Sequence, residues 1–119
     1  MVVDPYTARL AKVRSRFVST LEGKIEDTYA ALPKLSGDGV EIEAIDEAYR
    51  RIHGICGIRV AVGFPATSRA AKAVEDVLLA PVRARRGLMS NEVVPFKKAL
   101  HAIRETAQQE LRSFYMGLR

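Results

Sequence analysis

The stretch of the chain that decides the fold is EIEAIDEAYRRIHGICGIRVAVGFP, residues 41–65. Its apolar side chains recur every three or four residues, which is the spacing of one face of an α-helix. The members of this apolar stripe are Ile42, Ile45, Tyr49, Ile52 and Cys56. Gly63 and Pro65 then supply a helix end, because glycine suits the left-handed cap and proline rarely continues a helix. The pattern therefore predicts a helix over residues 41–62.

Two helices are expected before this stretch. Asp4 and Pro5 suit the cap and the first turn of a short N-terminal helix. A second helix is expected to end near Leu32, because Pro33 follows and the turn Ser-Gly-Asp-Gly comes next. The stripe of this second helix consists of Phe17, Leu21, Ile25, Tyr29 and Leu32.

Two more helices are expected after residue 65. One starts near Ala66 and is kinked or ended by Pro81. The last starts with Asn91 as its cap, which would place Pro95 in the first turn, where its missing N–H costs nothing. Four long amphipathic helices with short connections pack best as an antiparallel up-down bundle. The sequence thus predicts an all-α fold in one domain, residues 1–119: an antiparallel up-down four-helix bundle with a short additional N-terminal helix.

Composition narrows the class of protein. The chain has 119 residues, of which 48% are hydrophobic and 28% charged, as in a globular domain. No apolar run approaches the roughly 18 residues that cross a bilayer, and the start of the chain lacks a signal-peptide pattern. The single cysteine, Cys56, excludes an internal disulfide and fits a reducing compartment. We therefore expect a cytoplasmic protein. With one Cys and two His, we expect no metal site.

The net charge of +5 is unevenly distributed. Residues 1–62 carry nine Lys/Arg and nine Asp/Glu, whereas residues 63–119 carry ten and five. The excess includes Arg83, Arg85 and Arg86. Such a patch could attract nucleic acid, an acidic membrane or an acidic protein surface. The alternative is a solvated helix end without a partner.

His53 is the candidate functional residue. At about 100° per residue it lies about 100° from Ile52, at the edge of the apolar stripe. Gly54 and Gly57 stand inside the same predicted helix, where each costs roughly 1 kcal/mol relative to alanine. The missing side chain at Gly57 would leave the imidazole accessible to a bulky partner. The alternative is a half-buried surface histidine, with glycines that serve close helix packing.

The spacing around His53 resembles a known family. The matching positions are His53, Ile55, Gly57, Val62 and Gly63, followed by Ala70 and Ala73-Val74-Glu75. This pattern is similar to that of the histidine-containing phosphotransfer (HPt) domain family. The resemblance implies a helical bundle whose exposed histidine relays a phosphoryl group between aspartates of receiver domains. It also implies a covalent carrier without turnover and without a cofactor, since the receiver domain supplies Mg²⁺.

The chain departs from the family pattern in three places. Cys56 stands where the family usually has a lysine that helps to neutralise the phosphoryl group, and Ile58 and Arg59 replace small residues. Arg59 would point about 120° away from His53 on the helix. Cys56 lies in the apolar stripe, where burial makes a thiol inert. The cation must therefore come from another residue, and the candidates are Arg50, Arg69 and Lys72.

We hypothesise from the sequence that this is a stand-alone phosphotransfer protein acting through His53. Its partners would be the receiver domains of a hybrid histidine kinase and of a response regulator, with no membrane or nucleic acid involved, and we expect the protein to be a monomer. Ile42 and Val60 could form an apolar docking patch, or belong to the core margin. His101 reads as a surface residue without a partner.

Two alternatives remain open. A degenerate HPt-like module would bind a kinase or receiver without carrying phosphate, as the replacement of lysine by Cys56 would allow. A small basic helical protein would bind nucleic acid through residues 83–86 and the last helix, with affinity that falls steeply with salt. An enzyme with its own active site is disfavoured, because the sequence shows no Ser/His/Asp set, phosphate-binding loop or carboxylate pair.

Overall fold

The structure is a computed structural model that describes residues 4–116, apart from the side chains of residues 56–62. The described chain is all-helical, and its one β-bridge joins Ser36 to Leu88. In chain order the elements are α1 (Pro5–Ala30), α2 (Leu32–Leu35), the 3-10 turn η1 (Gly37–Gly39), α3 (Ile42–Val62), α4 (Pro65–Ala84) and α5 (Ser90–Met116).

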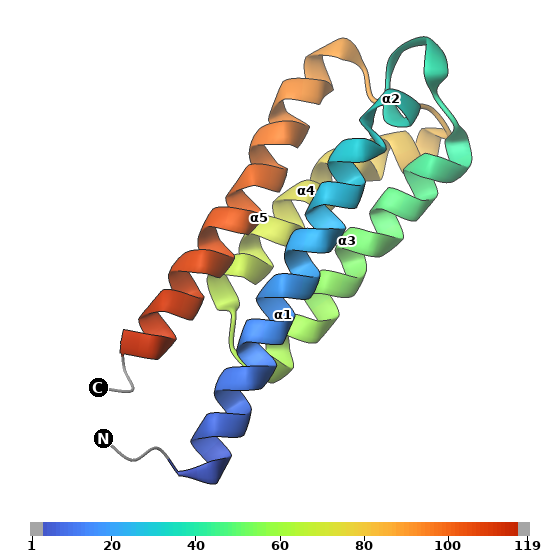
Figure 1. Ribbon diagram of the computed structural model, residues 1–119. Helices are drawn as coiled ribbons and strands as arrows, with labels where there is room; N and C mark the ends of the chain where they lie inside the picture. Colours follow the sequence, from blue (N-terminus) through green and yellow to red (C-terminus); the bar gives the residue numbers. More distant parts are fainter. Residues whose placement is uncertain (1–3, 117–119) are drawn as a thin grey trace.

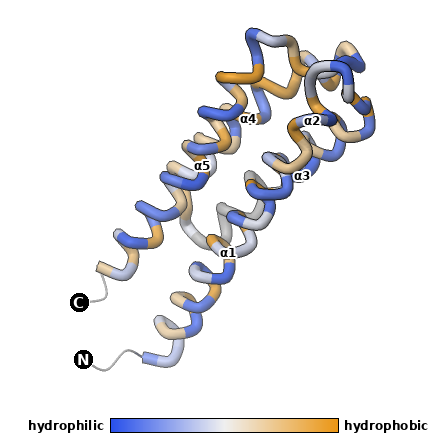
Figure 2. Tube along the Cα trace, turned by 45° about the horizontal axis from the view of Figure 1, so that its top comes forward, coloured by the Kyte–Doolittle hydropathy of each residue, from blue (hydrophilic) through white to orange (hydrophobic). Residues whose placement is uncertain are grey.

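The long helices lie side by side along an axis of 56 Å (Figure 1). Helix α1 contacts α3 and α5, and α4 contacts the same two helices. The ribbon reverses direction at each connection between long helices. Hydrophobic and hydrophilic residues alternate along α1, α4 and α5 (Figure 2). The buried hydrophobic residues of these helices recur with the helical period, as on one apolar face.

The expected short N-terminal helix does not exist as a separate element, and this prediction is wrong. The first turns belong to α1, which runs unbroken for 26 residues. Asp4 caps this helix as expected, because its carboxylate accepts hydrogen bonds from the backbone N–H of Thr7 at 2.9 Å and from its hydroxyl at 2.7 Å. Between Tyr6 and Ala30 the helix contains no proline, and Gly23 is its only glycine. One glycine destabilises a helix by about 1 kcal/mol relative to alanine, which does not interrupt so long a helix.

The core of the molecule is formed by all four long helices. Its largest fully buried side chains include Leu21, Ile25, Ile45, Ile52, Ile55, Phe64, Val74, Leu78, Phe96, Leu100 and Ile103. On α3 the buried line runs through Ala48 and Ile55, whereas Tyr49 is only half-buried. The inward face of α3 is therefore turned further from His53 than the predicted stripe implied.

The turn between α3 and α4 brings two distant aromatic rings together. Gly63 adopts a φ of 76°, the left-handed conformation that was expected to end the helix. The next residue, Phe64, is 2% exposed, and its ring centroid lies 4.8 Å from that of Phe17 in α1. The turn is thus anchored to the core by one side chain.

The helix boundaries around residues 81–95 differ from the expected ones. Helix α4 passes through Pro81 and ends at Ala84, because Arg85 takes the left-handed conformation with a φ of 53°. Helix α5 begins at Ser90 rather than after Asn91, so Pro95 lies in its second turn instead of its first.

Two acidic interactions set the start of α5. The carboxylate of Glu92 accepts a hydrogen bond from the backbone N–H of Met89 at 2.7 Å. The same carboxylate lies 2.8 Å from the Arg86 guanidinium, which donates to it. These bonds lower the pKa of Glu92 and raise that of Arg86, first of all through the hydrogen bond between the two side chains.

Candidate functional site

His53 lies on α3 with its ring open to solvent. Its side chain is 69% exposed, although its neighbours Ile52 and Ile55 are fully buried. The position at the edge of the apolar stripe therefore places the imidazole outside the core. A second protein can reach this ring without any change of the helix.

The ring is held by a carboxylate from the neighbouring helix. Nδ1 of His53 lies 2.7 Å from Oε1 of Glu75 in α4, and the Glu75 side chain is only 5% exposed. An ionised carboxylate can only accept, so Nδ1 carries the hydrogen in this bond. In the neutral ring the lone pair then belongs to Nε2, and no hydrogen bond from the described residues reaches that atom.

Lys72 completes a chain of three charged or polar groups. Its Nζ lies 3.5 Å from Oε2 of Glu75 and 3.6 Å from Oδ1 of Asp76. These two carboxylates, Asp76 first, raise the pKa of Lys72. The Lys72 side chain is 65% exposed, so its ammonium is open to solvent beside the His53–Glu75 pair.

The other two candidate cations, Arg50 and Arg69, do not interact with the His53–Glu75 pair. Arg50 and Arg69 are exposed on α3 and α4, and no ion pair is seen for either within the described residues. Of the three residues named from the sequence, Lys72 alone is joined to His53, through Glu75.

Tyr49 restricts the ring from a second side. It lies one turn before His53, with the two rings nearly parallel at 9° and their centroids 6.0 Å apart. The sequence assigned Tyr49 to the core, whereas it is half-buried and stacks on the candidate nucleophile. The stacking and the bond to Glu75 together favour one orientation of the imidazole.

Glu75 was quoted in the family pattern but given no role, and its position carried a signal. It lies between Ala71, Val74 and Leu78 on the buried face of α4. An ionised carboxylate on an apolar face is costly unless it is paired. A buried acid in an otherwise apolar stripe therefore predicts a partner on the facing helix, and here that partner is His53.

Of the two glycines beside His53, the structure describes the surroundings of Gly54 but not those of Gly57. A Cβ on Gly54 would meet Nζ of Lys24 in α1 at 3.8 Å, an ordinary contact, so packing does not demand glycine there. The access role expected of Gly57 lies outside the described side chains, as do Cys56, Arg59 and Val60. Ile42 is half-buried and remains available as part of a docking patch.

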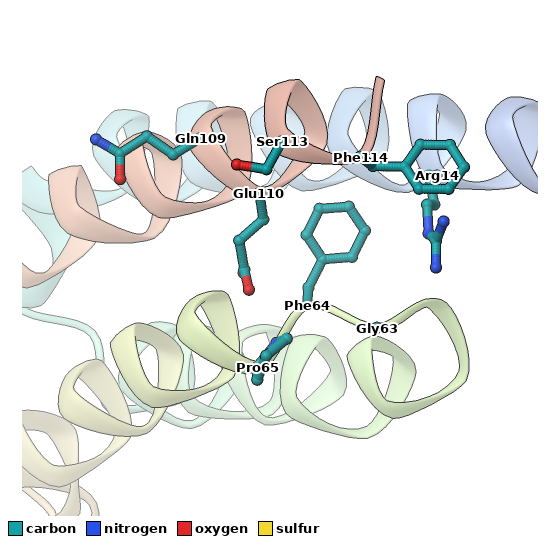
Figure 3. A pocket seen from close by; sticks show the side chains of 8 residues that line it. All are labelled: Arg14, Gly63, Phe64, Pro65, Gln109, Glu110, Ser113 and Phe114. Atoms are coloured by element: carbon teal, nitrogen blue, oxygen red, sulfur yellow. The ribbon is translucent and has the colours of Figure 1, made fainter. Parts of the chain in front are cut away.

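A cavity of about 540 Å³ lies at the end of the bundle near the turn between α3 and α4 (Figure 3). Gly63, which lines this cavity, comes ten residues after His53. At the rise of an α-helix, ten residues place it about 15 Å from His53 along the axis of α3. Glu110 borders this cavity but is engaged, because it accepts hydrogen bonds from the backbone N–H groups of Ala66 at 3.0 Å and Thr67 at 2.8 Å. The cavity is therefore a separate feature from the His53 site.

The remaining charged residues named from the sequence are partly paired. Arg86 is engaged with Glu92, which leaves Arg83 and Arg85 as the exposed members of the basic cluster. His101 is on the surface as expected, but it has a partner, since its Nε2 lies 2.8 Å from Oε1 of Glu105 one turn later. The prediction that it lacks a partner is wrong, because residues four apart on a helix are neighbours.

No helix in residues 4–116 is both long and apolar enough to cross a membrane. Among the described side chains, no three His, Cys, Asp or Glu residues are grouped as metal ligands would be. Comparison with family models, curated proteins and solved structures finds no match to this chain. The similarity to the HPt family therefore depends on the motif around His53.

Proposed function

We propose that this chain is a cytoplasmic, stand-alone histidine phosphotransfer protein built as an antiparallel up-down four-helix bundle. It would accept a phosphoryl group on His53 from the receiver domain of a hybrid histidine kinase and pass it to the receiver domain of a response regulator. The observation that supports this most is the His53–Glu75 pair: an exposed ring whose Nδ1 is held by a buried carboxylate, while no hydrogen bond from the described residues reaches Nε2.

The transfer step needs only the groups on this face and a receiver domain. The lone pair of Nε2 attacks the phosphorus of the aspartyl phosphate, an N–P bond forms, and the P–O bond to the aspartate breaks. The aspartate leaves as a carboxylate and the phosphoryl group is now on His53. The receiver domain would supply Mg²⁺, and the reverse step on a second receiver returns the histidine to its neutral form.

Glu75 and Lys72 suit the two charges that this step creates. As Nε2 gains the phosphoryl group, the ring becomes positively charged, and the buried Glu75 carboxylate balances that charge through Nδ1–H. The phosphoryl oxygens are negative, and Lys72 offers an exposed ammonium beside the pair. We infer that Lys72 replaces the cation that the family carries at the position of Cys56, ahead of Arg50 and Arg69.

The decisive experiment incubates the protein with a radiolabelled phosphorylated receiver domain. We expect acid-labile, base-stable label on the wild type and none on His53→Gln. His101→Gln is the matched control and should be labelled as well as the wild type, because that histidine has no buried carboxylate behind it. Equal labelling of His53→Gln would remove His53 as the acceptor.

The degenerate module remains a second candidate because Cys56 stands in place of the usual lysine. It predicts that a receiver domain binds the wild type and His53→Gln equally well while neither acquires label. Labelling of the wild type in the experiment above rejects this alternative directly.

A further inference from the structure

The first turns of α1 extend beyond the rest of the bundle. Both views show this helix continuing past the turn between α3 and α4 and past the end of α5 (Figures 1 and 2). The hydroxyls of Ser15 and Tyr115 hydrogen-bond where α5 ends, and Phe17 meets Phe64 at the turn. Residues 5–13, about 14 Å of helix, thus lie beyond these contacts.

An apolar stripe runs along this projecting part. Its members Tyr6 and Val13 are 67% and 49% exposed, and Leu10 between them is half-buried. The intervals 6–10–13–17 are four, three and four residues, which is the a/d seam of a coiled coil and narrower than the apolar face of an ordinary surface helix. At Phe17 the same seam enters the core. The seam is therefore built for one more helix beside α1.

The residues beside the seam are basic. With Leu10 and Phe17 as a positions, the flanking g positions are Arg9 and Arg16, and the e positions are Thr7 and Arg14. Arg14 lies over the Phe114 ring, 3.8 Å from its centroid. Arg9 and Arg16 are exposed, and the described part of the chain shows no carboxylate paired with either. In coiled coils these positions choose the partner through charge.

We propose that residues 5–17 of α1 are a docking site for an acidic amphipathic helix of another protein. The partner helix would place apolar residues against Tyr6, Leu10 and Val13, and its carboxylates would face Arg9 and Arg16. A second copy of this chain is a poor occupant, because either helix direction would bring arginines of one copy against those of the other. A membrane is also a poor fit, because a three-residue seam buries little apolar area in a bilayer.

The test uses the full chain and two synthetic peptides of about three heptads, both with Leu at a and d. One carries Glu at e and g, and the other carries Lys there. Fluorescence anisotropy should show binding of the Glu peptide and none of the Lys peptide. Tyr6→Ser with Val13→Ser should abolish binding, and these exposed changes leave the core untouched. Equal binding of the two peptides, or binding that survives the seam variant, overturns the proposal.

A charge exchange provides the matched control. Arg9→Glu with Arg16→Glu should lower the affinity for the Glu peptide by about tenfold or more and should allow the Lys peptide to bind. Lys97→Glu with Lys98→Glu makes the same change of net charge on α5 and should alter the binding of neither peptide. An equal loss in both double variants would reduce the effect to overall charge and contradict the proposal.

Two further measurements on the chain alone separate the other occupants. Sedimentation velocity should show a monomer at concentrations where the peptide binds, and a dimer that Tyr6→Ser with Val13→Ser dissolves would assign the seam to a second copy instead. Anionic phosphatidylserine vesicles should not retain the protein, and retention without peptide binding would assign it to a lipid surface. Neither result bears on transfer at His53.

Discussion

The two histidines of this chain make nearly the same bond and differ in what lies behind it. His53 Nδ1 is 2.7 Å from Glu75, and His101 Nε2 is 2.8 Å from Glu105. Glu75 is buried and comes from the facing helix, whereas Glu105 is 60% exposed and comes from the same helix, one turn away. The first contact is fixed by the packing of α3 on α4, while the second competes with water. Burial of the acceptor, rather than the length of the bond, distinguishes a positioned ring from a surface ion pair.

The largest effect is expected when the carboxylate behind each ring is replaced by an amide. Glu75→Gln keeps the shape and can still accept from Nδ1–H, but it removes the negative charge that balances the phosphorylated ring. We expect the rate of label transfer from a phosphorylated receiver to fall by about 10- to 100-fold. Glu105→Gln is the control and should leave the rate unchanged. Similar rates for the two variants would remove the distinction between the sites.

A smaller effect is expected from the cation beside the pair. The carboxylates of Asp76 and Glu75 raise the pKa of Lys72, which favours its charged form further. We expect Lys72→Ala to slow transfer by about five- to tenfold. Arg69→Ala removes an exposed cation one turn earlier on α4 and should change the rate by less than about twofold. If the two results are exchanged, Arg69 is the cation that faces the phosphoryl group.

The pattern of apolar residues predicted which segments are helical, but it could not predict where distant side chains set their ends. Asp4 caps its own helix and was visible in the sequence. Glu110 caps α4 from a position more than 40 residues away, and no local pattern announces that contact. The start of α5 differs for another reason, because Glu92 accepts a hydrogen bond from the backbone N–H of Met89, a local contact over three residues that the expected cap at Asn91 overlooked. Caps made through tertiary contacts appear only once the helices are packed.

The same limit applies to the candidate site. The helical wheel predicted that His53 lies at the edge of the stripe, and its exposure follows from that position. The partner Glu75 depends on the relative register of α3 and α4, which periodicity does not contain. A buried carboxylate among apolar residues was nevertheless visible on α4. The environment of Gly57 lies outside the described side chains, so its access role stays a prediction.

The rate of label transfer in Gly57→Arg tests that access role. A long side chain one turn after His53 would stand in the path of a docking receiver, since residues four apart share a helix face. We expect slower transfer with an unchanged circular dichroism spectrum, because arginine favours helix more than glycine does. Lys12→Arg, a change on α1 away from His53, is the control and should leave both the transfer rate and the circular dichroism spectrum unchanged. An unaltered rate in Gly57→Arg would remove the argument that glycine keeps the ring accessible.

A stability measurement sharpens the contrast between the two carboxylates further. Glu75→Leu replaces a buried charge by an apolar group and leaves exposed partners, His53 and Lys72, which water can solvate. We expect this variant to be as stable as the wild type or more stable by about 1 kcal/mol, while its rate of label transfer falls as in Glu75→Gln. Glu105→Leu should change the free energy of unfolding by less than about 0.5 kcal/mol. A loss of several kcal/mol in Glu75→Leu would mean that Glu75 is retained for the fold.

The smallest effect is a difference in proton position that requires no change of sequence. Glu75 accepts from Nδ1 of His53, so the neutral ring should carry its hydrogen on Nδ1 and leave Nε2 unprotonated. Glu105 faces Nε2 of His101, so that ring should carry its hydrogen on Nε2. Nitrogen chemical shifts of the two imidazoles in their neutral form distinguish these tautomers. In Glu75→Leu the His53 pattern should shift towards that of His101, because nothing then selects Nδ1–H. If both rings already share one tautomer in the wild type, the buried carboxylate does not prepare Nε2 as the nucleophile.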